Sequence, residues 1–193
     1  GRKSVGQRPK VAFIFPGQGS QWVGMGRELL QREAVFRSKL EECEAAMRPY
    51  QEWSLIEELN QGTVDAELQR IDVVQPLLFA MQVGLAELWR SWGVEPDAVV
   101  GHSMGEVAAA CVSGVLSLEA GAQVICQRSQ LLRRLSGRGA MAVVELSAGA
   151  VAGALGGEAG LVSVAAVNSW RTTVISGERE AVKRLVEKFG SEN

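Results

Sequence analysis

The sequence predicts an α/β protein. Short apolar runs with the length of buried strands alternate with longer segments whose apolar residues recur at helical spacing. The first run, residues 11–15, leads into the glycine loop PGQGSQ, and a later run, residues 97–100, leads into GHSMG. A chain of 193 residues that is 47% hydrophobic and 22% charged is long enough for one large core or two small ones.

The first part of the chain is expected to hold two strands and several helices. A strand over residues 10–15 is followed by helical periodicity from Arg27 to about Met47, which Pro49 ends. Beyond it we expect a short helix, a long apolar helix with Pro76 in its first turn, a strand and two more helices, over residues 54–59, 73–94, 97–103, 104–114 and 117–137. Ser117 is the candidate N-cap of the last helix, and Glu119 places a negative charge in its first turn.

The pattern changes near residue 137. Strand, weak helix, strand, strand and helix are expected in turn, over residues 140–146, 148–155, 161–168, 172–177 and 178–190. This β-α-β-β-α order is one strand short of the ferredoxin-like β-α-β-β-α-β unit. We therefore predict a linker over residues 1–9, the N-terminal part of a large α/β subdomain over 10–137, and a partial ferredoxin-like small subdomain over 138–193. Both subdomains have too few strands, so the sequence is expected to end before the fold does.

Composition argues against several classes of function. The net charge is −2 and there is no long basic run, so nucleic acid and anionic membranes are poor partners. Three cysteines and one histidine lack the spacing of a zinc site, and no metal is expected. An odd number of cysteines without a signal peptide indicates a cytoplasmic protein. No uncharged apolar run approaches the roughly 18 residues of a membrane span.

GHSMG, residues 101–105, fits the G-x-S-x-G pattern of a nucleophile elbow between a strand and a helix. The apolar residues before it and the small residues after it supply that context, so the first subdomain is expected to have an α/β-hydrolase-like core. Ser103 is the candidate nucleophile. The amide of Met104, at the start of the next helix, would donate to the oxyanion. The alternative is a buried serine in a tight loop.

His102 is the only histidine, and it adjoins Ser103. Adjacent residues at the end of a strand point to opposite sides, so its imidazole is not expected to reach the serine as a base. We expect His102 to pack beside the site, and a histidine base, if there is one, to lie beyond residue 193.

With FPGQGSQ near one end and GHSMGE further along, the chain resembles the acyltransferase domains of modular polyketide synthases. These are related to the malonyl-CoA:acyl carrier protein transacylases, and the resemblance runs from about residue 10 to 193. It implies that Ser103 takes an acyl group from coenzyme A and passes it to the phosphopantetheine thiol of an acyl carrier protein. The backbone amides of Gln18 and Met104 would form the oxyanion hole.

The resemblance also implies the molecules that this chain works with. They are a malonyl-type acyl-CoA as substrate, an acyl carrier protein, and a neighbouring ketosynthase domain of the same polypeptide, with no tightly bound cofactor. The family's catalytic histidine follows the small subdomain and has no counterpart here, so this chain alone is expected to be inactive.

Arg128 lies in an apolar stripe of the predicted helix over residues 117–137, formed by Val124, Ile125, Leu131, Leu132 and Leu135. A buried guanidinium needs an anion. The family places an arginine here to hold the free carboxylate of malonyl-type substrates as a bidentate pair. The alternative is a structural salt bridge to an interior Glu or Asp.

Two further residues resemble substrate-binding positions of the family. Gln75 is similar to a glutamine near the acyl group, with a surface helix cap as the alternative. Asn168 is similar to an asparagine that faces the cleft, with a turn residue as the alternative. The stretch RIDVVQ, residues 70–75, looks like that of methylmalonyl-selecting domains, whereas Met104 does not distinguish malonyl from methylmalonyl. We expect methylmalonyl over malonyl.

Three other functions remain open. A patatin-like serine hydrolase pairs its elbow serine with an aspartate in an Asp-Gly pair, and this chain has no Asp-Gly. A non-catalytic half-domain could bind carrier protein without turnover. A general α/β-hydrolase would need an oxyanion loop and a triad acid, for which the sequence offers no candidate.

Overall fold

The structure is a computed structural model that describes residues 9–61 and 70–191. The chain divides into two units, Gly1–Arg134 and Leu135–Asn193, and each is described by itself. The predicted linker lies outside the described residues except for Pro9.

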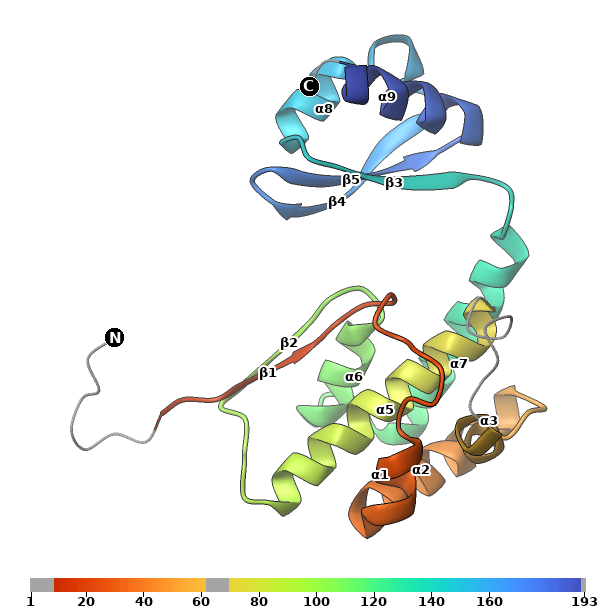
Figure 1. Cartoon of the computed structure of the whole chain (residues 1–193), viewed down its shortest axis with the longest axis vertical. Helices are drawn as coiled ribbons and strands as arrows, with labels where there is room; N and C mark the ends of the chain where they lie inside the picture. The colour runs from red at the N-terminus through yellow and green to blue at the C-terminus, as the bar shows by residue number, and fades with distance from the viewer. Residues whose placement is uncertain (1–8, 62–69, 192–193) are drawn as a thin grey trace. The chain divides into compact units, whose positions relative to one another are not determined.

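The first unit has a parallel pair of strands, β1 (Ala12–Phe15) and β2 (Ala98–Gly101). Ala12 pairs with Ala98, and Phe15 with Gly101, so both strands end at the same edge. The helices of this unit are α1 (Arg27–Arg32), α2 (Ala34–Met47), a 3₁₀ turn (Arg48–Tyr50), α3 (Leu55–Gln61), α5 (Ile71–Ser91), α6 (Gly105–Val112) and α7 (Leu118–Leu135) (Figure 1).

Helix α5 is the centre of the first core. Most of its residues are buried, and its Gly84 lets α2 come close, since a Cβ there would lie 2.5 Å from Leu40 Cδ1 and 2.9 Å from Phe36 Cε2. Among the described residues, α5 alone is long and apolar enough to cross a membrane. Of its most apolar 18-residue stretch, 78% is buried inside the protein.

Two sequence predictions for this unit are wrong in detail. The helix expected from Arg27 to Met47 is interrupted at Glu33, whose φ of −108° and ψ of 102° are extended. The Arg37 guanidinium donates to the carbonyls of Leu30 and Gln31, which the break leaves without helical partners. Pro76 lies inside α5 and not in its first turn, because the helix begins at Ile71.

The second unit has the predicted β-α-β-β-α order. Its elements are β3 (Ala140–Val144), α8 (Ala148–Ala154), a 3₁₀ turn (Gly156–Glu158), β4 (Val162–Ser169), β5 (Thr172–Gly177) and α9 (Arg179–Ser191). The antiparallel sheet has the order β3-β5-β4. Its core joins Val144, Val162 and Ile175 of the sheet to Val151 of α8 and Leu185 of α9.

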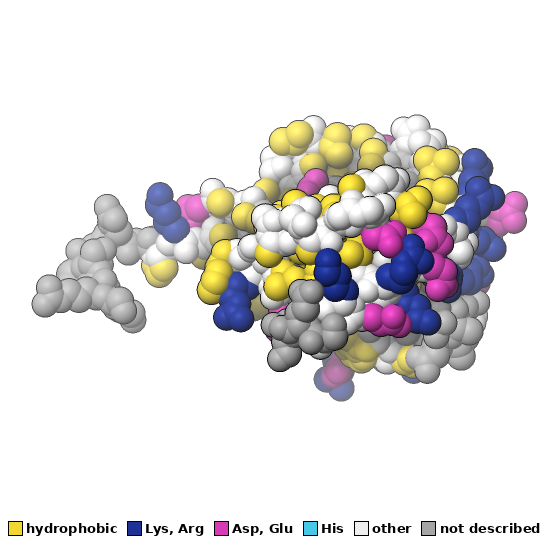
Figure 2. All heavy atoms as spheres, turned by 90° about the horizontal axis from the view of Figure 1, so that it is seen from above, with side chains coloured by type: hydrophobic (Ala, Val, Ile, Leu, Met, Phe, Trp, Pro, Cys, Tyr) yellow, Lys and Arg dark blue, Asp and Glu magenta, His cyan; other side chains and the backbone are white. Residues whose placement is uncertain are grey.

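Charged side chains of both signs are intermingled on the face shown in Figure 2. In the second unit, Arg184 of α9 donates to both carboxylate oxygens of Glu158, at 2.8 and 2.9 Å. This hydrogen bond lowers the pKa of the Glu158 carboxyl. The pair is exposed, so it is expected to add little to stability.

Candidate active site

The elbow predicted around Ser103 is present. β2 ends at Gly101 and α6 begins at Gly105, and Ser103 between them has a φ of 53°, the one positive φ of a non-glycine residue among those described. Such a conformation costs about 1–3 kcal/mol and is typical of functional turns. The hydroxyl is on an exposed residue, at the carboxyl end of the strand.

The two glycines of the motif are explained by close backbone contacts. A Cβ at Gly105 would lie 2.1 Å from the carbonyl oxygen of Phe15, and one at Gly101 would lie 2.4 Å from Cα of Glu106. The backbone N–H of His102 also donates to the Phe15 carbonyl at 3.0 Å. The turn is therefore pressed against the end of β1, and only glycine fits at either side of it.

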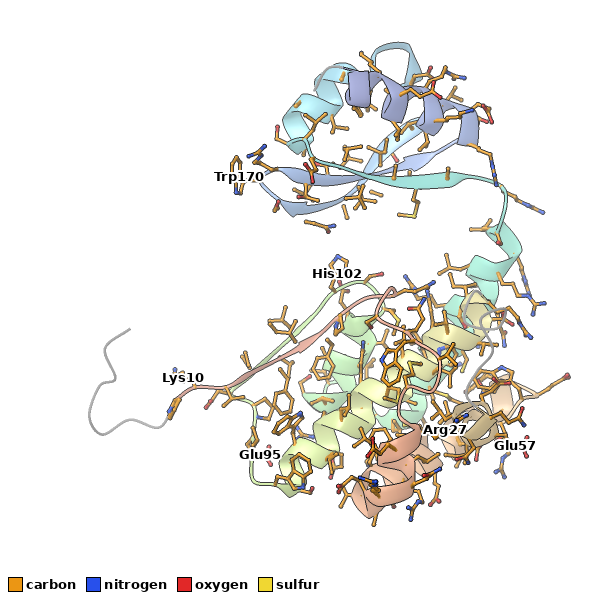
Figure 3. The ribbon with its side chains drawn as sticks, viewed as in Figure 1. Lys10, Arg27, Glu57, Glu95, His102 and Trp170 are labelled. Atoms are coloured by element: carbon orange, nitrogen blue, oxygen red, sulfur yellow. The ribbon has the colours of Figure 1, made fainter. Side chains whose placement is uncertain are left out.

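The PGQGSQ loop lies beside this turn. A Cβ at Gly17 would lie 3.0 Å from Nδ1 of His102 and 3.6 Å from Cβ of Ser103. His102 is exposed, and its side chain points away from the helices of the first unit (Figure 3). The Met104 side chain is buried in the core, which anchors the start of α6.

Four predicted residues from four segments meet at the elbow. Arg128 of α7 donates from Nη2 to Ser103 Oγ at 3.4 Å, and from Nη1 to Gln75 Oε1 at 2.5 Å. Gln75 of α5 donates in turn from Nε2 to Gln18 Oε1 at 3.2 Å. Gln75 is 4% exposed and lies within α5, so the alternative of a surface helix cap is wrong.

The apolar stripe predicted around Arg128 is not the buried face of α7. Of the proposed apolar stripe, Val124, Leu131 and Leu135 are 43%, 56% and 58% exposed, because α7 turns a different face to the core. That face carries Gly121, Ala122, Ile125, Cys126 and Ser129. Arg128 lies at its margin, half-buried, and both partners that the structure gives it are neutral.

Asn168 lies near the end of β4 in the second unit and is exposed. It is not among the residues that the first unit brings together. Asp72, which sequence reasoning did not single out, lies one turn before Gln75 in α5 and pairs with Arg133 of α7 at 2.7 Å. The signal that could have found it is the charged residue within an otherwise apolar helix start.

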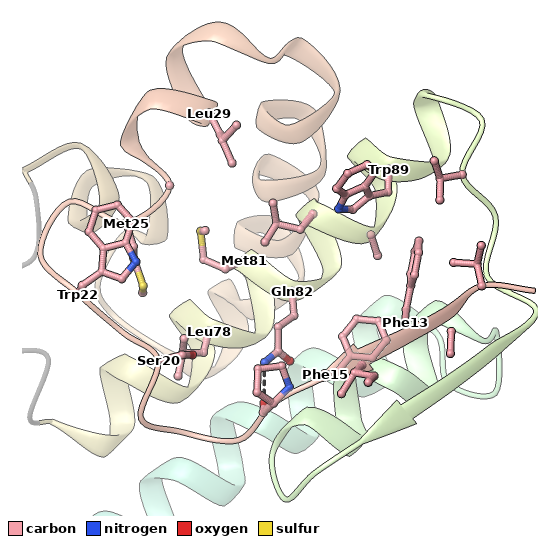
Figure 4. A pocket seen from close by; sticks show the side chains of 18 residues that line it. Phe13, Phe15, Ser20, Trp22, Met25, Leu29, Leu78, Met81, Gln82 and Trp89 are labelled. Atoms are coloured by element: carbon pink, nitrogen blue, oxygen red, sulfur yellow. Dashed lines mark hydrogen bonds between the residues drawn. The ribbon is translucent and has the colours of Figure 1, made fainter. Parts of the chain in front are cut away.

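The first unit also has an apolar hollow of about 660 Å³ that does not include Ser103, Gln75 or Arg128. It is bounded by β1, α1 and α5, and Gln82 at its wall donates to the carbonyl of Pro16 at 2.7 Å (Figure 4). Apart from Ser20 and Gln82 its lining is apolar, and it contains none of the four residues that meet at the elbow. In residues 9–61 and 70–191, no three His, Cys, Asp or Glu side chains gather as a metal site would require.

Comparison with known proteins identifies the family. The model of the acyl transferase domain matches residues 12–193. This chain belongs to the acyl transferase domain family. It is 52% identical over 182 residues to erythronolide synthase EryA2 of Saccharopolyspora erythraea. The matched region is 94% of this chain and 5% of that synthase.

Solved acyl transferase domains share the fold. A loading acyltransferase from the avermectin modular polyketide synthase matches with a TM-score of 0.84 and 49% identity, over 95% of this chain and 59% of that one. The malonyl-CoA:ACP transacylase of Synechocystis matches with a TM-score of 0.80 and 35% identity, over 93% of this chain and 58% of that one. The resemblance drawn from FPGQGSQ and GHSMGE is confirmed, and the α/β fold is that of these domains. The chain spans less than two thirds of either solved domain.

The three thiols of this acyl transferase domain are poor nucleophiles. Burial raises the pKa of Cys43 and of Cys126 to about 12, and that of Cys111 to about 11. The thiolate is the nucleophilic form of cysteine, so these side chains are unreactive at neutral pH.

Proposed function

We propose that this acyl transferase domain moves a malonyl-type acyl group from coenzyme A to the phosphopantetheine thiol of an acyl carrier protein, through an ester on Ser103. The observation that carries this proposal is the Arg128 guanidinium, 3.4 Å from the hydroxyl of a serine held at an elbow. A cation at that distance suits a substrate whose anionic end must lie close to its reacting carbonyl. Malonyl-type groups have this shape.

The reaction divides into two exchanges at one carbon. Ser103 Oγ attacks the thioester carbonyl, the C–S bond breaks, and coenzyme A leaves as its thiol with the proton that the serine loses. The carrier thiol then attacks the ester, and Ser103 regains its hydroxyl. The amides of Met104 and Gln18 would donate to the oxyanion in both steps, since Met104 is the N-cap of α6 and Gln18 lies in the loop beside the elbow.

Arg128 and Gln75 would set the substrate class. Because Gln75 and Ser103, the hydrogen-bond partners of Arg128, are neutral, its charge is available to a carboxylate, which would accept two parallel hydrogen bonds from the guanidinium. Gln75 fixes one side of that guanidinium. A preference for methylmalonyl is supported by the RIDVVQ stretch, whose last residue is this buried glutamine. One methyl group is worth about 1–3 kcal/mol of discrimination.

Other parts of the proposal rest on the family resemblance. The two units would correspond to an α/β-hydrolase-like subdomain (10–137) and a ferredoxin-like one (138–193), with Asn168 and His102 beside the substrate. A ketosynthase domain would adjoin, and the protein would be cytoplasmic and use coenzyme A thioesters without a resident cofactor. Because His102 is the only imidazole in these 193 residues, any other histidine base would come from outside them.

The experiment is a two-step transfer assay. The full-length protein here means a chain that contains these 193 residues and has the length of the solved acyl transferase domains. It is incubated with acyl carrier protein and with methylmalonyl-, malonyl- or acetyl-CoA. Mass spectrometry then measures the acyl-enzyme, the acylated carrier protein and the free acid. The proposal expects a serine ester that is passed to the carrier, fastest for methylmalonyl-CoA. Release of free acid without transfer would favour the patatin-like hydrolase. No ester at all would favour a non-catalytic binding domain.

A further inference from the structure

One face of α5 meets α7 at three levels. Asp72 accepts from Arg133 at 2.7 Å, and Gln75 accepts from Arg128 at 2.5 Å. One turn further on, Phe79 lies so close to Gly121 that a Cβ there would be 3.1 Å from the ring. Positions 72, 75 and 79 share a helix face, while their partners 133, 128 and 121 run backwards along α7. The residues of the proposed carboxylate site are thus the middle contact of an antiparallel helix pair.

The two arginines reach α5 from different sides of α7. They are five residues apart, which is a rotation of about 140° around the helix axis. Between them lies the face that carries the buried Ile125 and Ser129. The first turn of α5 is therefore held from both sides, by Arg128 through Gln75 and by Arg133 through Asp72.

That first turn is weakly joined to the rest of its own helix. Pro76 lies inside α5 and has no N–H, so the carbonyl of Asp72 loses the donor that would close the helical ring. The first turn of α5, which carries Gln75, therefore has one fewer hydrogen bond to the rest of the helix than it would in a helix without proline. Contacts from outside the helix consequently matter more for the position of Gln75 than they would in an uninterrupted helix.

Asp72 is equipped to make such a contact. Its side chain is 9% exposed, and Oδ2 accepts from both Arg133 and Arg70, the latter at 3.1 Å. Burial alone raises the pKa of the Asp72 carboxyl, but the hydrogen bond from Arg70 and the charges of Arg70 and Arg133 hold it below its ordinary value. The carboxylate is therefore ionised at neutral pH, and its pairing with α7 is charge-assisted.

We infer that Asp72 and Arg133 are positioning residues for the carboxylate site: their ion pair holds the first turn of α5 against α7, so that Gln75 presents Arg128 to the substrate beside Ser103. This inference rests on the proposed function of Arg128. It adds a pair that does not touch the substrate and that acts on selectivity through Gln75. Arg133 is 61% exposed, so its removal leaves no large cavity.

The test uses the full-length protein and the ratio of kcat/KM for methylmalonyl-CoA to that for acetyl-CoA. Arg133→Met should lower this ratio roughly 3- to 10-fold, the size of coupling between side chains in one network. Arg133→Lys, which keeps a charge for Asp72, should restore most of it. Arg134→Met is the matched control: Arg134 is the exposed neighbour on α7, and its replacement should leave the ratio unchanged.

A double variant shows whether the pair acts through Arg128. In an Arg128→Ala background, Arg133→Met should cause no further change in the ratio. If Arg128→Ala lowers the ratio but Arg133→Met does not, the positioning role is wrong and the proposed function stands. If Arg128→Ala leaves the ratio unchanged, the proposed carboxylate site is wrong, and the positioning role falls with it. Equal loss for both substrates in Arg133→Met, with lowered thermal stability, would show a structural ion pair only.

Discussion

The guanidinium of Arg128 donates to the hydroxyl of Ser103 at 3.4 Å, although the residues are 25 positions apart. One belongs to α7 and the other to the turn between β2 and α6. At this length the hydrogen bond is weak, so a substrate carboxylate could take its place at little cost. The contact thus fixes where a cation stands relative to the proposed nucleophile.

Replacing Arg128 by alanine should separate substrates by charge. We expect kcat/KM for methylmalonyl-CoA to fall about 10²-fold or more, since an anion that has left water would lose its partner. Acetyl-CoA has no carboxylate, so its transfer should change little. The measurement is the ratio of the two values. Arg128→Lys should recover only part of it, because an ammonium cannot make the two parallel hydrogen bonds. Equal losses for both substrates would mean that Arg128 is structural.

Ser103→Ala should abolish the covalent intermediate. The peptide that contains residue 103 should gain the acyl mass in the parent protein and not in the variant, and transfer should fall by several orders of magnitude. Ser113→Ala, at the exposed C-terminal end of α6, is the matched control and should retain the adduct. Because burial raises the pKa of all three thiols, no acyl group should move to cysteine at neutral pH. An adduct that persists in Ser103→Ala would refute the assignment.

Local sequence signals were enough to predict the elements that carry the site. Both strands of the first unit, the serine turn and the β-α-β-β-α order follow from short apolar runs, glycines and helical periodicity. The break at Glu33 was missed because Ala34 to Met47 continue the apolar period, and only the Arg37 contacts mark the new helix.

The contacts between helices were harder to predict. Helical spacing placed Arg128 in a stripe of α7 that is largely exposed. Periodicity alone cannot tell which of two partly apolar helix faces packs against the core. Asp72 and Arg133 are 61 positions apart and show no motif, so their pairing needed the fold. Gln75 was recognised by resemblance alone. Its burial and its two hydrogen-bond partners come from the structure.

Gly105→Ala should unfold the elbow. The added Cβ would lie 2.1 Å from the carbonyl oxygen of Phe15, at the end of a strand that cannot move without breaking its pairing with β2. We expect a loss of about 3 kcal/mol or more in the free energy of unfolding, measured with denaturant. Gly153→Ala is the control, because nothing lies within 4 Å of its Cβ in helix α8. It should stabilise by about 0.5–1 kcal/mol. Equal stability of the two variants would contradict the close contact.

His102→Ala should leave most of the activity of the full-length protein. A general base contributes roughly 10²–10⁴ in rate, so a loss below tenfold would show that His102 is not the base. The structural reason is that its imidazole lies against the PGQGSQ loop, with Nδ1 3.0 Å from where a Cβ of Gly17 would be. Gly17→Ala should therefore displace the imidazole and give the same small loss, and combining the two changes should add nothing. The 193-residue chain alone, with His102 as its one imidazole, should show little or no turnover. Robust turnover by that chain, lost in His102→Ala, would instead assign the base to His102.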